Sequence, residues 1–317
     1  MIATGKRLAG VLAVLLLAVA PPAAWPQLTT TIATPRIFLV GQGPEGLAFD
    51  GAHLWVANQF SNSITKIQVA NPAIVSEFSV GRGPIALLFD GTSLWVANVH
   101  GHDVAKVSPA DGAVIGRVRV GRGPGALAFD GANVWVANRN SDTVTKLRAA
   151  DGTILGTYQV GVRPTAVAVR DQYVWVVNNR GNSITKLRAS DGQTAATYQI
   201  PNAPFDLAFE GEHVWVTNHY TSTVTKLRAQ DGQILATVQV GHGPAGIAFD
   251  GVNLWVVNNG NDTVTALRPS DGTVVATVPV GRAPFGVEIS VASGAPRVWV
   301  ASTASNSVTL IDPGGVM

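Results

Sequence analysis

A pattern of proline, tryptophan and asparagine recurs every 40 residues along most of this 317-residue chain. The repeated region spans residues 41–310 and contains seven copies of the pattern. The prolines are Pro44, Pro84, Pro124, Pro164, Pro204, Pro244 and Pro284. The tryptophans are Trp55, Trp95, Trp135, Trp175, Trp215 and Trp255, and the seventh, Trp299, comes four residues late. Such a period is typical of repeat architectures, so we expect one repeat array and no second domain.

Each copy contains the pattern of four short strands. In the third copy the predicted strands are GALAFD (125–130), NVWVAN (133–138), TVTKLR (143–148) and TILGTYQV (153–160). Asp130-Gly131 and Asp151-Gly152 separate apolar runs, and Asp-Gly is a strong hairpin signal because glycine accepts a positive φ. The first two strands are almost continuously apolar, as in sheets covered on both faces, whereas the fourth alternates like an exposed outer strand.

Four strands in about 40 residues is the signature of a propeller blade. The chain ends favour a closed ring over an open solenoid. The segment PRIFLVG (35–41) resembles the fourth strand of a repeat, and the last repeat supplies only three strands. The first segment can therefore complete the last blade and remove the open sheet edge. The sequence predicts an all-β, seven-bladed propeller with four-stranded blades.

The first 24 residues differ from the repeats. Lys6 and Arg7 precede an apolar run, Leu8 to Ala20, and small residues follow, which is the pattern of a secretory signal peptide. An uncleaved anchor is the alternative, although the run is short for a bilayer span of about 20 residues. We expect a signal peptide at 1–24, a linker at 25–34, the propeller at 35–312 and a tail at 313–317. The mature protein is then secreted or periplasmic, with no membrane span.

The net charge and the absence of cysteine argue against several classes of function. The 22 Lys and Arg residues include Lys6 and Arg7, so the chain after the signal carries 20 basic and 20 acidic residues. This balance does not indicate a nucleic-acid partner. The chain has no cysteine, which excludes disulfides, thiolate chemistry and a lipid-anchoring cysteine.

The second strands end in WVAN, WVVN or WVTN, and a loop and an S/T-[IV]-T-K segment follow in most copies. This pattern resembles the YVTN-type β-propeller repeats of bacterial exported and surface proteins, with Trp in place of Tyr. It is also similar to NHL repeats and to virginiamycin B lyase-like propellers. The resemblance covers residues 35–312 and implies a fold more than an activity, because most such propellers have no assigned reaction.

The repeated residues are first interpreted as structural. We expect the tryptophans to fill the wedges between blades. We expect the asparagines to bond the backbone of the loop that each begins, and the third-strand lysines to extend toward solvent. The asparagines are Asn58, Asn98, Asn138, Asn178, Asn218 and Asn258. The lysines are Lys66, Lys106, Lys146, Lys186 and Lys226.

Function on a propeller is expected where the copies differ. The loops before each proline and after each asparagine share one face, at the mouth of the central channel, and they vary most. The candidate ligand-binding residues are Arg82, Arg122, Arg139, Arg163, Arg180, Asp206, His219, Tyr220, His242 and Arg282. We expect an exported, monomeric, non-enzymatic protein without a cofactor, which binds a small molecule, a glycan or an envelope protein at this mouth.

Two carboxylates suggest an enzymatic alternative. Asp206 and Glu288 occupy positions that the other copies fill with glycine, alanine or leucine, and a buried carboxylate is costly unless it is paired. With His219 and His242 they are weak candidates for acid–base work or for a Mg²⁺ or Ca²⁺ site. The lyase resemblance implies such a metal, a histidine base and a carboxylate, although lyase-like repeats carry Glu where this chain has Asn.

More conservative interpretations stand beside the enzymatic one. Asp206 and Glu288 can simply pair with Arg282 or with ordered water. A further hypothesis is a small metal clip formed by His100, His102 and Asp103 in the second repeat.

Overall fold

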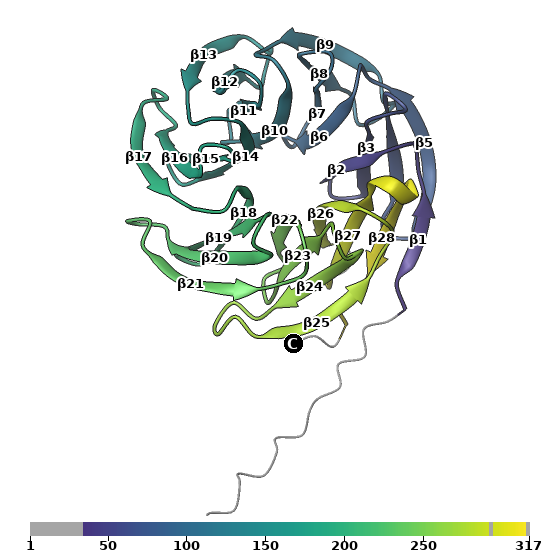
Figure 1. Ribbon diagram of the computed structural model, residues 1–317. Coiled ribbons are helices and arrows are strands. Elements are labelled where there is room, and N and C mark those ends of the chain that lie inside the picture. The colour runs from purple at the N-terminus through teal and green to yellow at the C-terminus, as the bar shows by residue number, and fades with distance from the viewer. Residues whose placement is uncertain (1–33, 292–293, 315–317) are drawn as a thin grey trace, which may run out of the picture. The chain divides into compact units, whose positions relative to one another are not determined.

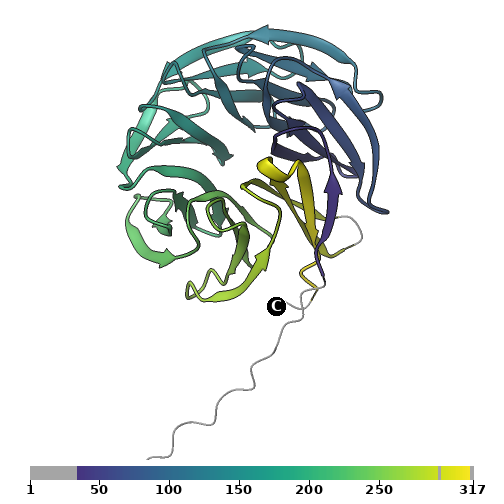
Figure 2. The same cartoon turned by 45° about the vertical axis from the view of Figure 1, so that its right-hand side comes forward.

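The computed structural model describes residues 34–291 and 294–314. Their 28 strands form seven four-stranded antiparallel sheets. Figure 1 shows these sheets as blades around a common axis, with the first strand of each blade innermost. Figure 2 shows the same ring from a second direction. The predicted seven-bladed propeller is therefore confirmed. No helix in the described ranges is long and apolar enough to cross a membrane.

The blades follow the chain in order. Blade 1 contains β2 (Pro44–Phe49), β3 (His53–Asn58), β4 (Ser63–Gln68) and β5 (Ala73–Ser79). Blade 2 contains β6 (Pro84–Phe89), β7 (Leu94–Asn98), β8 (Asp103–Val107) and β9 (Val114–Arg119). Blade 3 contains β10 (Pro124–Phe129), β11 (Asn133–Asn138), β12 (Thr143–Arg148) and β13 (Ile154–Gln159). Blade 4 contains β14 (Pro164–Arg170), β15 (Tyr173–Asn178), β16 (Ser183–Arg188) and β17 (Thr194–Gln199).

The remaining blades complete the ring. Blade 5 contains β18 (Pro204–Glu210), β19 (His213–Asn218), β20 (Thr223–Arg228) and β21 (Ile234–Gln239). Blade 6 contains β22 (Pro244–Phe249), β23 (Leu254–Asn258), β24 (Thr263–Leu267) and β25 (Val274–Pro279). Blade 7 contains β26 (Pro284–Val291), β27 (Pro296–Ser302) and β28 (Ser307–Ile311), and a short 3-10 helix, η1 (Thr303–Ser305), lies between its last two strands.

The ring closes as expected, because β1 (Arg36–Leu39) forms the outer strand of blade 7. It pairs antiparallel with β28, and Phe38 lies opposite Val308. In blade 3 the second and third strands have the predicted bounds, and the first and fourth differ by one residue. Ile154, which the alternation places inward, is 49% exposed, because the register shifts between Lys146 and Leu147.

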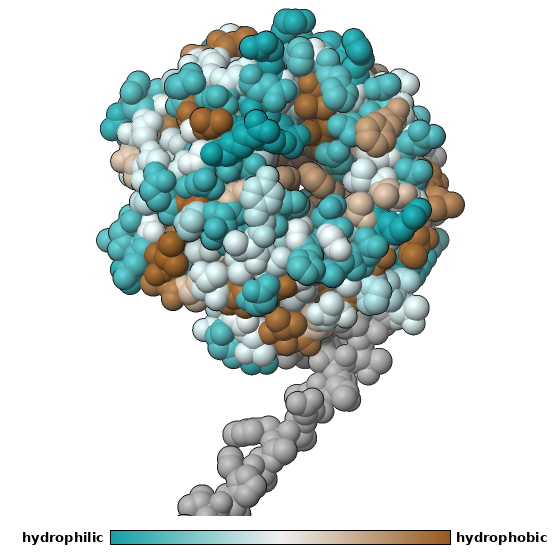
Figure 3. Space-filling model, in the orientation of Figure 1, coloured by the Kyte–Doolittle hydropathy of each residue, from teal (hydrophilic) through white to brown (hydrophobic). Residues whose placement is uncertain are grey.

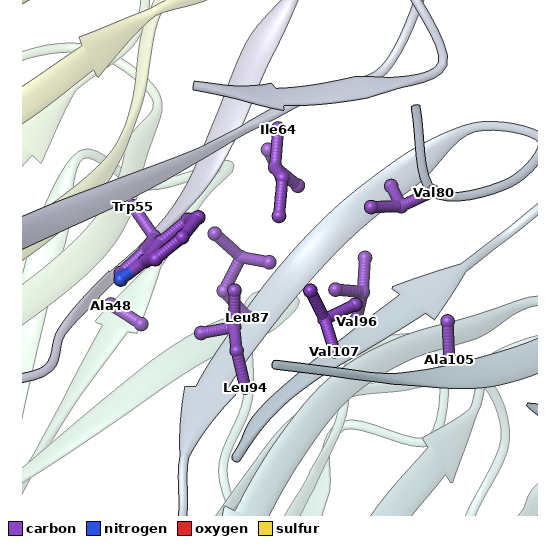
Figure 4. Close-up of a cluster of buried hydrophobic side chains, with 10 residues drawn as sticks. Ala48, Trp55, Ile64, Val80, Leu87, Leu94, Val96, Ala105 and Val107 are labelled. Atoms are coloured by element: carbon purple, nitrogen blue, oxygen red, sulfur yellow. The ribbon is translucent and has the colours of Figure 1, made fainter. Parts of the chain in front are cut away.

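The tryptophans fill the wedges between blades, as predicted. Trp55 of blade 1 lies in one buried cluster with Leu87 and Leu94 of blade 2 (Figure 4). Each of the seven junctions has such a cluster, with a tryptophan from the preceding blade. Burial of these side chains at every junction holds the ring together without disulfides.

An aspartate in the first turn fixes the tryptophan in four blades. In blade 3, Trp135 Nε1 donates to Asp130 Oδ2 at 2.8 Å, and the backbone N–H of Asn133 donates to Asp130 Oδ1 at 2.7 Å. Burial alone would raise the pKa of Asp130, but these hydrogen bonds bring it below its usual value. The equivalent bonds to Asp50, Asp90 and Asp250 are present in blades 1, 2 and 6.

The third-strand lysines do not extend freely into solvent, which corrects the sequence-based interpretation. The Lys146 ammonium lies 5.0 Å from the centre of the Trp135 ring and donates to the carbonyl oxygen of Ala189, in the next blade, at 2.7 Å. The other four lysines make the same bond to the blade that follows. The ammonium satisfies a turn carbonyl and contacts an aromatic face, so these residues clamp neighbouring blades.

The expected role of the asparagines is also wrong. The side-chain amide of Asn138 donates to the hydroxyls of Thr143 and Thr145 on the adjacent strand, not to its own loop. The same pair of bonds recurs in blades 1, 4, 5 and 6. The asparagine therefore ties the second strand to the third, because hydroxyls five and seven residues ahead face it across the sheet.

Candidate functional site at the channel mouth

The innermost strands of the seven blades line a cavity of about 200 Å³ on the axis. Figure 3 shows a face of the molecule that is hollowed at its centre. The residues after the repeated prolines form a ring, and all of them except the buried Ala245 line this cavity. The ring consists of Glu45, Ile85, Gly125, Thr165, Phe205, Ala245 and Phe285. The ring is therefore acidic in one blade, aromatic in two and without a side chain in one.

Arg139 fills the place that the missing side chain of Gly125 leaves. A Cβ atom on Gly125 would lie 2.7 Å from Cγ of Arg139, so this arginine lies directly over the glycine. The equivalent residues of blades 4 to 7 behave differently and bond the proline carbonyl of the next blade. They are Asn179, His219, Asn259 and Thr303. Arg139 makes no such bond to any described residue and packs on Gly125, which lines the cavity.

Arg163 and Glu45 complete a charged cluster with Arg139. Burial raises the pKa of Glu45 to about 7, and the charge of Arg139 opposes this shift. Burial lowers the pKa of Arg139, Glu45 opposes that shift, and the like charge of Arg163 adds to it. Within the described residues, neither guanidinium group has a hydrogen bond or an ion pair. The mouth therefore contains two incompletely neutralised cations.

The backbone of Arg163 is in a conformation that suits glycine better. Its φ is 56°, and four blades have Gly43, Gly83, Gly123 or Gly243 at this position. A non-glycine residue in the left-handed region costs about 1 kcal/mol or more. Ala203 and Ala283 adopt the same conformation in blades 5 and 7, so the long charged side chain, not the backbone, distinguishes blade 4 at this position.

Aromatic side chains occupy another part of the mouth. Phe205 and Phe285 meet edge to face with ring centres 5.4 Å apart, and His219 lies 5.6 Å from Phe205. Tyr220 follows at 5.8 Å from His219 and is 79% exposed. His219 donates from Nδ1 to the carbonyl oxygen of Pro244 at 3.3 Å, which leaves Nε2 as its free ring nitrogen. These rings form an aromatic arc that can contact an apolar or planar group.

Asp206 is engaged by the protein. Its Oδ1 accepts from its neighbour Leu207 N at 2.8 Å, and its Oδ2 accepts from Ile247 N, in blade 6, at 3.1 Å. Burial raises the pKa of Asp206 to about 6, although these hydrogen bonds lower it. No pairing with Arg282 is present in the described residues; backbone N–H groups satisfy the carboxylate instead.

A threonine departs from the repeat together with Asp206. The Thr217 hydroxyl accepts from Asp206 N at 3.0 Å and donates to the carbonyl oxygen of Ala245 at 2.8 Å. The other blades have alanine or valine at the position of Thr217. Asp206 and Thr217 therefore form a polar latch between blades 5 and 6, which is a structural role.

Glu288 lies on the innermost strand of blade 7. Burial raises its pKa to about 8, and only the backbone N–H of Ile289 opposes this shift. No ion pair to Glu288, from Arg282 or another residue, is present among the described residues. The carboxyl is therefore largely protonated at neutral pH.

The other candidates surround the mouth without entering it. Arg82, Arg122, Arg180 and Arg282 are exposed loop residues. His242 is exposed, and its Nδ1 lies 3.1 Å from the hydroxyl of Ser222. These exposed residues can contribute to a larger contact surface around the Arg139–Arg163–Glu45 cluster.

The proposed metal sites do not assemble. His102 Nδ1 accepts from Gly123 N at 3.1 Å, and Asp103 pairs with Arg117 at 2.9 Å. The two side chains of the supposed clip therefore already have other partners. Over the described ranges, no group of three or more His, Asp and Glu side chains could hold a metal ion. The clip hypothesis is wrong, and Asp206, His219, His242 and Glu288 do not form a metal centre.

Solved structures confirm that the fold is shared. A selenomethionine-substituted virginiamycin B lyase from Staphylococcus aureus has a TM-score of 0.75 at 16% identity, and the match covers 88% of this chain and 99% of that chain. A streptogramin B lyase has a TM-score of 0.75 at 19% identity and coverages of 87% and 96%. Hydrazine synthase from Kuenenia stuttgartiensis has a TM-score of 0.75 at 19% identity and coverages of 85% and 95%. Similarity at these identities concerns the fold alone.

Sequence comparison adds one result. No curated protein matches the chain. A family model described as outer membrane protein assembly factor BamB matches residues 100–312, which is more than half of the sequence.

Proposed function

The chain belongs to the family described as outer membrane protein assembly factor BamB, and from this premise we propose that it is an exported, non-enzymatic binding protein. Its ligand is a small molecule, a glycan or an envelope protein, and it binds at the channel mouth. The WVAN-type strand ends support the finer assignment to YVTN-type repeats. Export rests on the family and on the signal pattern at residues 1–24, which lie outside the described residues. Closure of all seven blades within one chain supports a monomer.

The mouth supports binding because it contains incompletely neutralised arginines next to aromatic side chains. Glu45 neutralises Arg139 only in part, because burial raises the pKa of that carboxyl to about 7, and Arg163, which replaces the glycine or alanine of the other blades, has no ion pair in the described part of the chain. An enclosed cation that is incompletely neutralised is costly for the folded protein, and an anionic ligand group removes that cost. The aromatic arc of Phe205, His219 and Tyr220 offers the apolar contact that usually accompanies such a group.

The proposal is tested by changing the two arginines together. Arg139→Met keeps the apolar stem of the side chain, and Arg163→Gly restores the residue of four other blades. We expect the double variant to remain folded and to lose its partner in affinity capture from an envelope extract. The matched control is Arg148→Ala, an exposed arginine that pairs with Asp151 outside the mouth, which should capture normally. Unchanged capture by the double variant would show that the mouth is not the binding site.

The metal-dependent lyase alternative has weaker support. Two solved relatives carry the word lyase in their names, but their identities of 16% and 19% concern the fold alone. The carboxylate of Asp206 and the Nδ1 atoms of both candidate histidines already have partners. The residues therefore do not fit a Mg²⁺ or Ca²⁺ centre, and we derive no reaction step from one. A saturable Mg²⁺- or Ca²⁺-dependent rise in melting temperature would reopen this alternative.

A further inference from the structure

A second cavity lies between blades 4 and 5, on the face where the first turns of the blades lie. Its volume is about 570 Å³, and its walls include Arg170, Tyr173, Trp175 and Lys186 of blade 4 and Arg228 of blade 5. None of these residues belongs to the channel mouth. The size suits a small organic molecule, since ligand pockets usually occupy about 300–1,000 Å³.

The cavity is located where the aspartate of the first turn is missing. In blades 1, 2, 3 and 6, that aspartate accepts a hydrogen bond from the indole N–H of the blade's tryptophan at 2.6–2.8 Å. In blade 7 the hydroxyl of Ser290 accepts it. Blade 4 has Arg170 at the aspartate position. Blade 5 has Glu210 there, but its carboxylate contacts His213 and Lys226, and Trp215 Nε1 makes no hydrogen bond within the described residues. The four blades with an aspartate thus show that a carboxylate at this place can accept the indole N–H.

The substitution leaves an indole donor without an acceptor. Trp175 Nε1 makes no hydrogen bond within the described residues, and Trp175 is 2% exposed, whereas Trp95 and Trp135 are 0% exposed. The Arg170 guanidinium does not take the place of the missing group. It lies 5.3 Å from the ring centre of Phe209, in blade 5, and only loosely approaches Asp171 at 3.7 Å.

The nearest cation is also less fully bonded than its equivalents. Lys186 Nζ donates to the carbonyl oxygen of Ala229 at 3.2 Å, whereas the other four lysine clamps have their shortest bonds at 2.7–2.9 Å. The ammonium lies 4.2 Å from the ring centre of Tyr173 and 4.7 Å from that of Trp175. Burial lowers the pKa of Lys186, and the charge of Asp171 opposes this shift.

The acidic residues of the cavity lie at its solvent side. The side chain of Asp171 is 80% exposed, and Glu212 is also exposed. Arg228, the third cation, pairs with Asp231 at 2.9 Å on the adjacent turn. The interior thus presents an indole N–H, an ammonium and aromatic faces, and the carboxylates lie where water screens them.

We propose that this cavity binds an organic carboxylate, whose oxygens replace the aspartate carboxylate of blades 1, 2, 3 and 6 as acceptors for Trp175 Nε1 and Lys186 Nζ. The aromatic walls contact the apolar part of the same molecule. This site is independent of the channel mouth, so the two proposals can fail separately.

The test uses benzoate as the probe and benzamide as its uncharged isostere. Indole N–H signals are recorded by ¹H–¹⁵N NMR at constant ionic strength, and Trp175→Phe assigns the signal of Trp175. We expect a saturable benzoate-dependent shift of this signal, and binding of benzamide weaker by about tenfold or more, since a charge-assisted bond is lost. Equal affinity for the two probes, or absence of a saturable shift with benzoate, would overturn the proposal.

Two variants locate the binding. Arg170→Asp together with Asp171→Gly restores the Asp-Gly turn of the other blades, so the protein supplies its own carboxylate. We expect this variant to fold, to show the Trp175 signal shifted without ligand and to lose benzoate binding. Lys186→Met should weaken benzoate binding about tenfold. The control Arg148→Asp adds a negative charge on the same face of blade 3 and should bind normally.

Two further results would contradict the proposed carboxylate site. Undiminished benzoate binding by the restored-turn variant would place the ligand elsewhere and reject the site. Inorganic phosphate that shifts the same signal with equal affinity would contradict the carboxylate assignment.

Discussion

Single residues that depart from the repeat place ionisable carboxyl groups near the axis of the channel. Glu45, Asp206 and Glu288 have carboxyl groups whose pKa values burial raises to about 7, 6 and 8. Each departs from the small or apolar residues that other blades hold near the axis. Burial thus shifts three carboxyl groups of the innermost strands toward the protonated form, whereas hydrogen bonds shift the first-turn aspartates toward the ionised form.

The raised pKa of Glu288 predicts a pH dependence of stability. The folded pKa of about 8 exceeds the usual 4.5, so the folded protein binds more protons than the unfolded chain between these values. Stability therefore falls as pH rises through this window. Glu288→Gln removes this contribution and should raise the melting temperature at pH 8.5 but hardly change it at pH 4.5. Thermal unfolding across this range measures the effect, with the exposed Glu212→Gln as control. Parallel profiles for Glu288→Gln and the wild type would contradict it.

Sequence reasoning identified Asp206 and Glu288 because both break a column of small or apolar residues. It placed Arg139 among several arginines without distinguishing it. Gly125 was the sequence feature that could have distinguished Arg139, because no other blade has glycine directly after the repeated proline. That feature can be interpreted only in the structure, where Arg139 packs over the glycine. The partners of Asp206 are backbone N–H groups, which no residue pattern reveals.

At the scale of strands and blades, the lysine clamps connect elements that the sequence separates by 43 residues. They join blades 1 to 5 to their successors. Blade 6 has Ala266 at the lysine position, and in blade 7 Arg297 of β27 takes over and donates to the carbonyl oxygen of Val69 at 2.6 Å. The strands themselves were predictable to within about one residue in blade 3, because turns and alternation are local. The clamps were not, since their acceptors are backbone atoms of another blade.

Breaking one clamp should loosen one junction. Lys146→Met keeps the apolar stem against Trp135 and removes the bond to Ala189 and the charge above the ring. We expect a loss of about 1–2 kcal/mol in the free energy of unfolding. Denaturant titration measures this loss. Arg148→Met, which breaks an exposed ion pair on the same strand, should cost much less. Equal effects of the two substitutions would mean that the lysine does not act as a clamp.

The whole molecule depends on one short strand, because β1 alone closes the ring. Phe38 lies 5.9 Å from Trp299 and belongs to the cluster between blades 7 and 1. Without β1, strand β28 would present unpaired backbone groups and the cluster would lose an aromatic ring. Open edges of this kind lead to association between molecules.

A pair of shortened chains tests this dependence. A chain that begins at residue 35 keeps β1, and a chain that begins at residue 41 lacks it. We expect the first to unfold in one cooperative transition as a monomer. The second should melt at a lower temperature and self-associate, because its seventh blade has three strands and an exposed edge. Light scattering after size exclusion and thermal unfolding provide the measurements. A monomeric second chain with an unchanged melting temperature would show that the seven inter-blade clusters hold the ring without its closing strand.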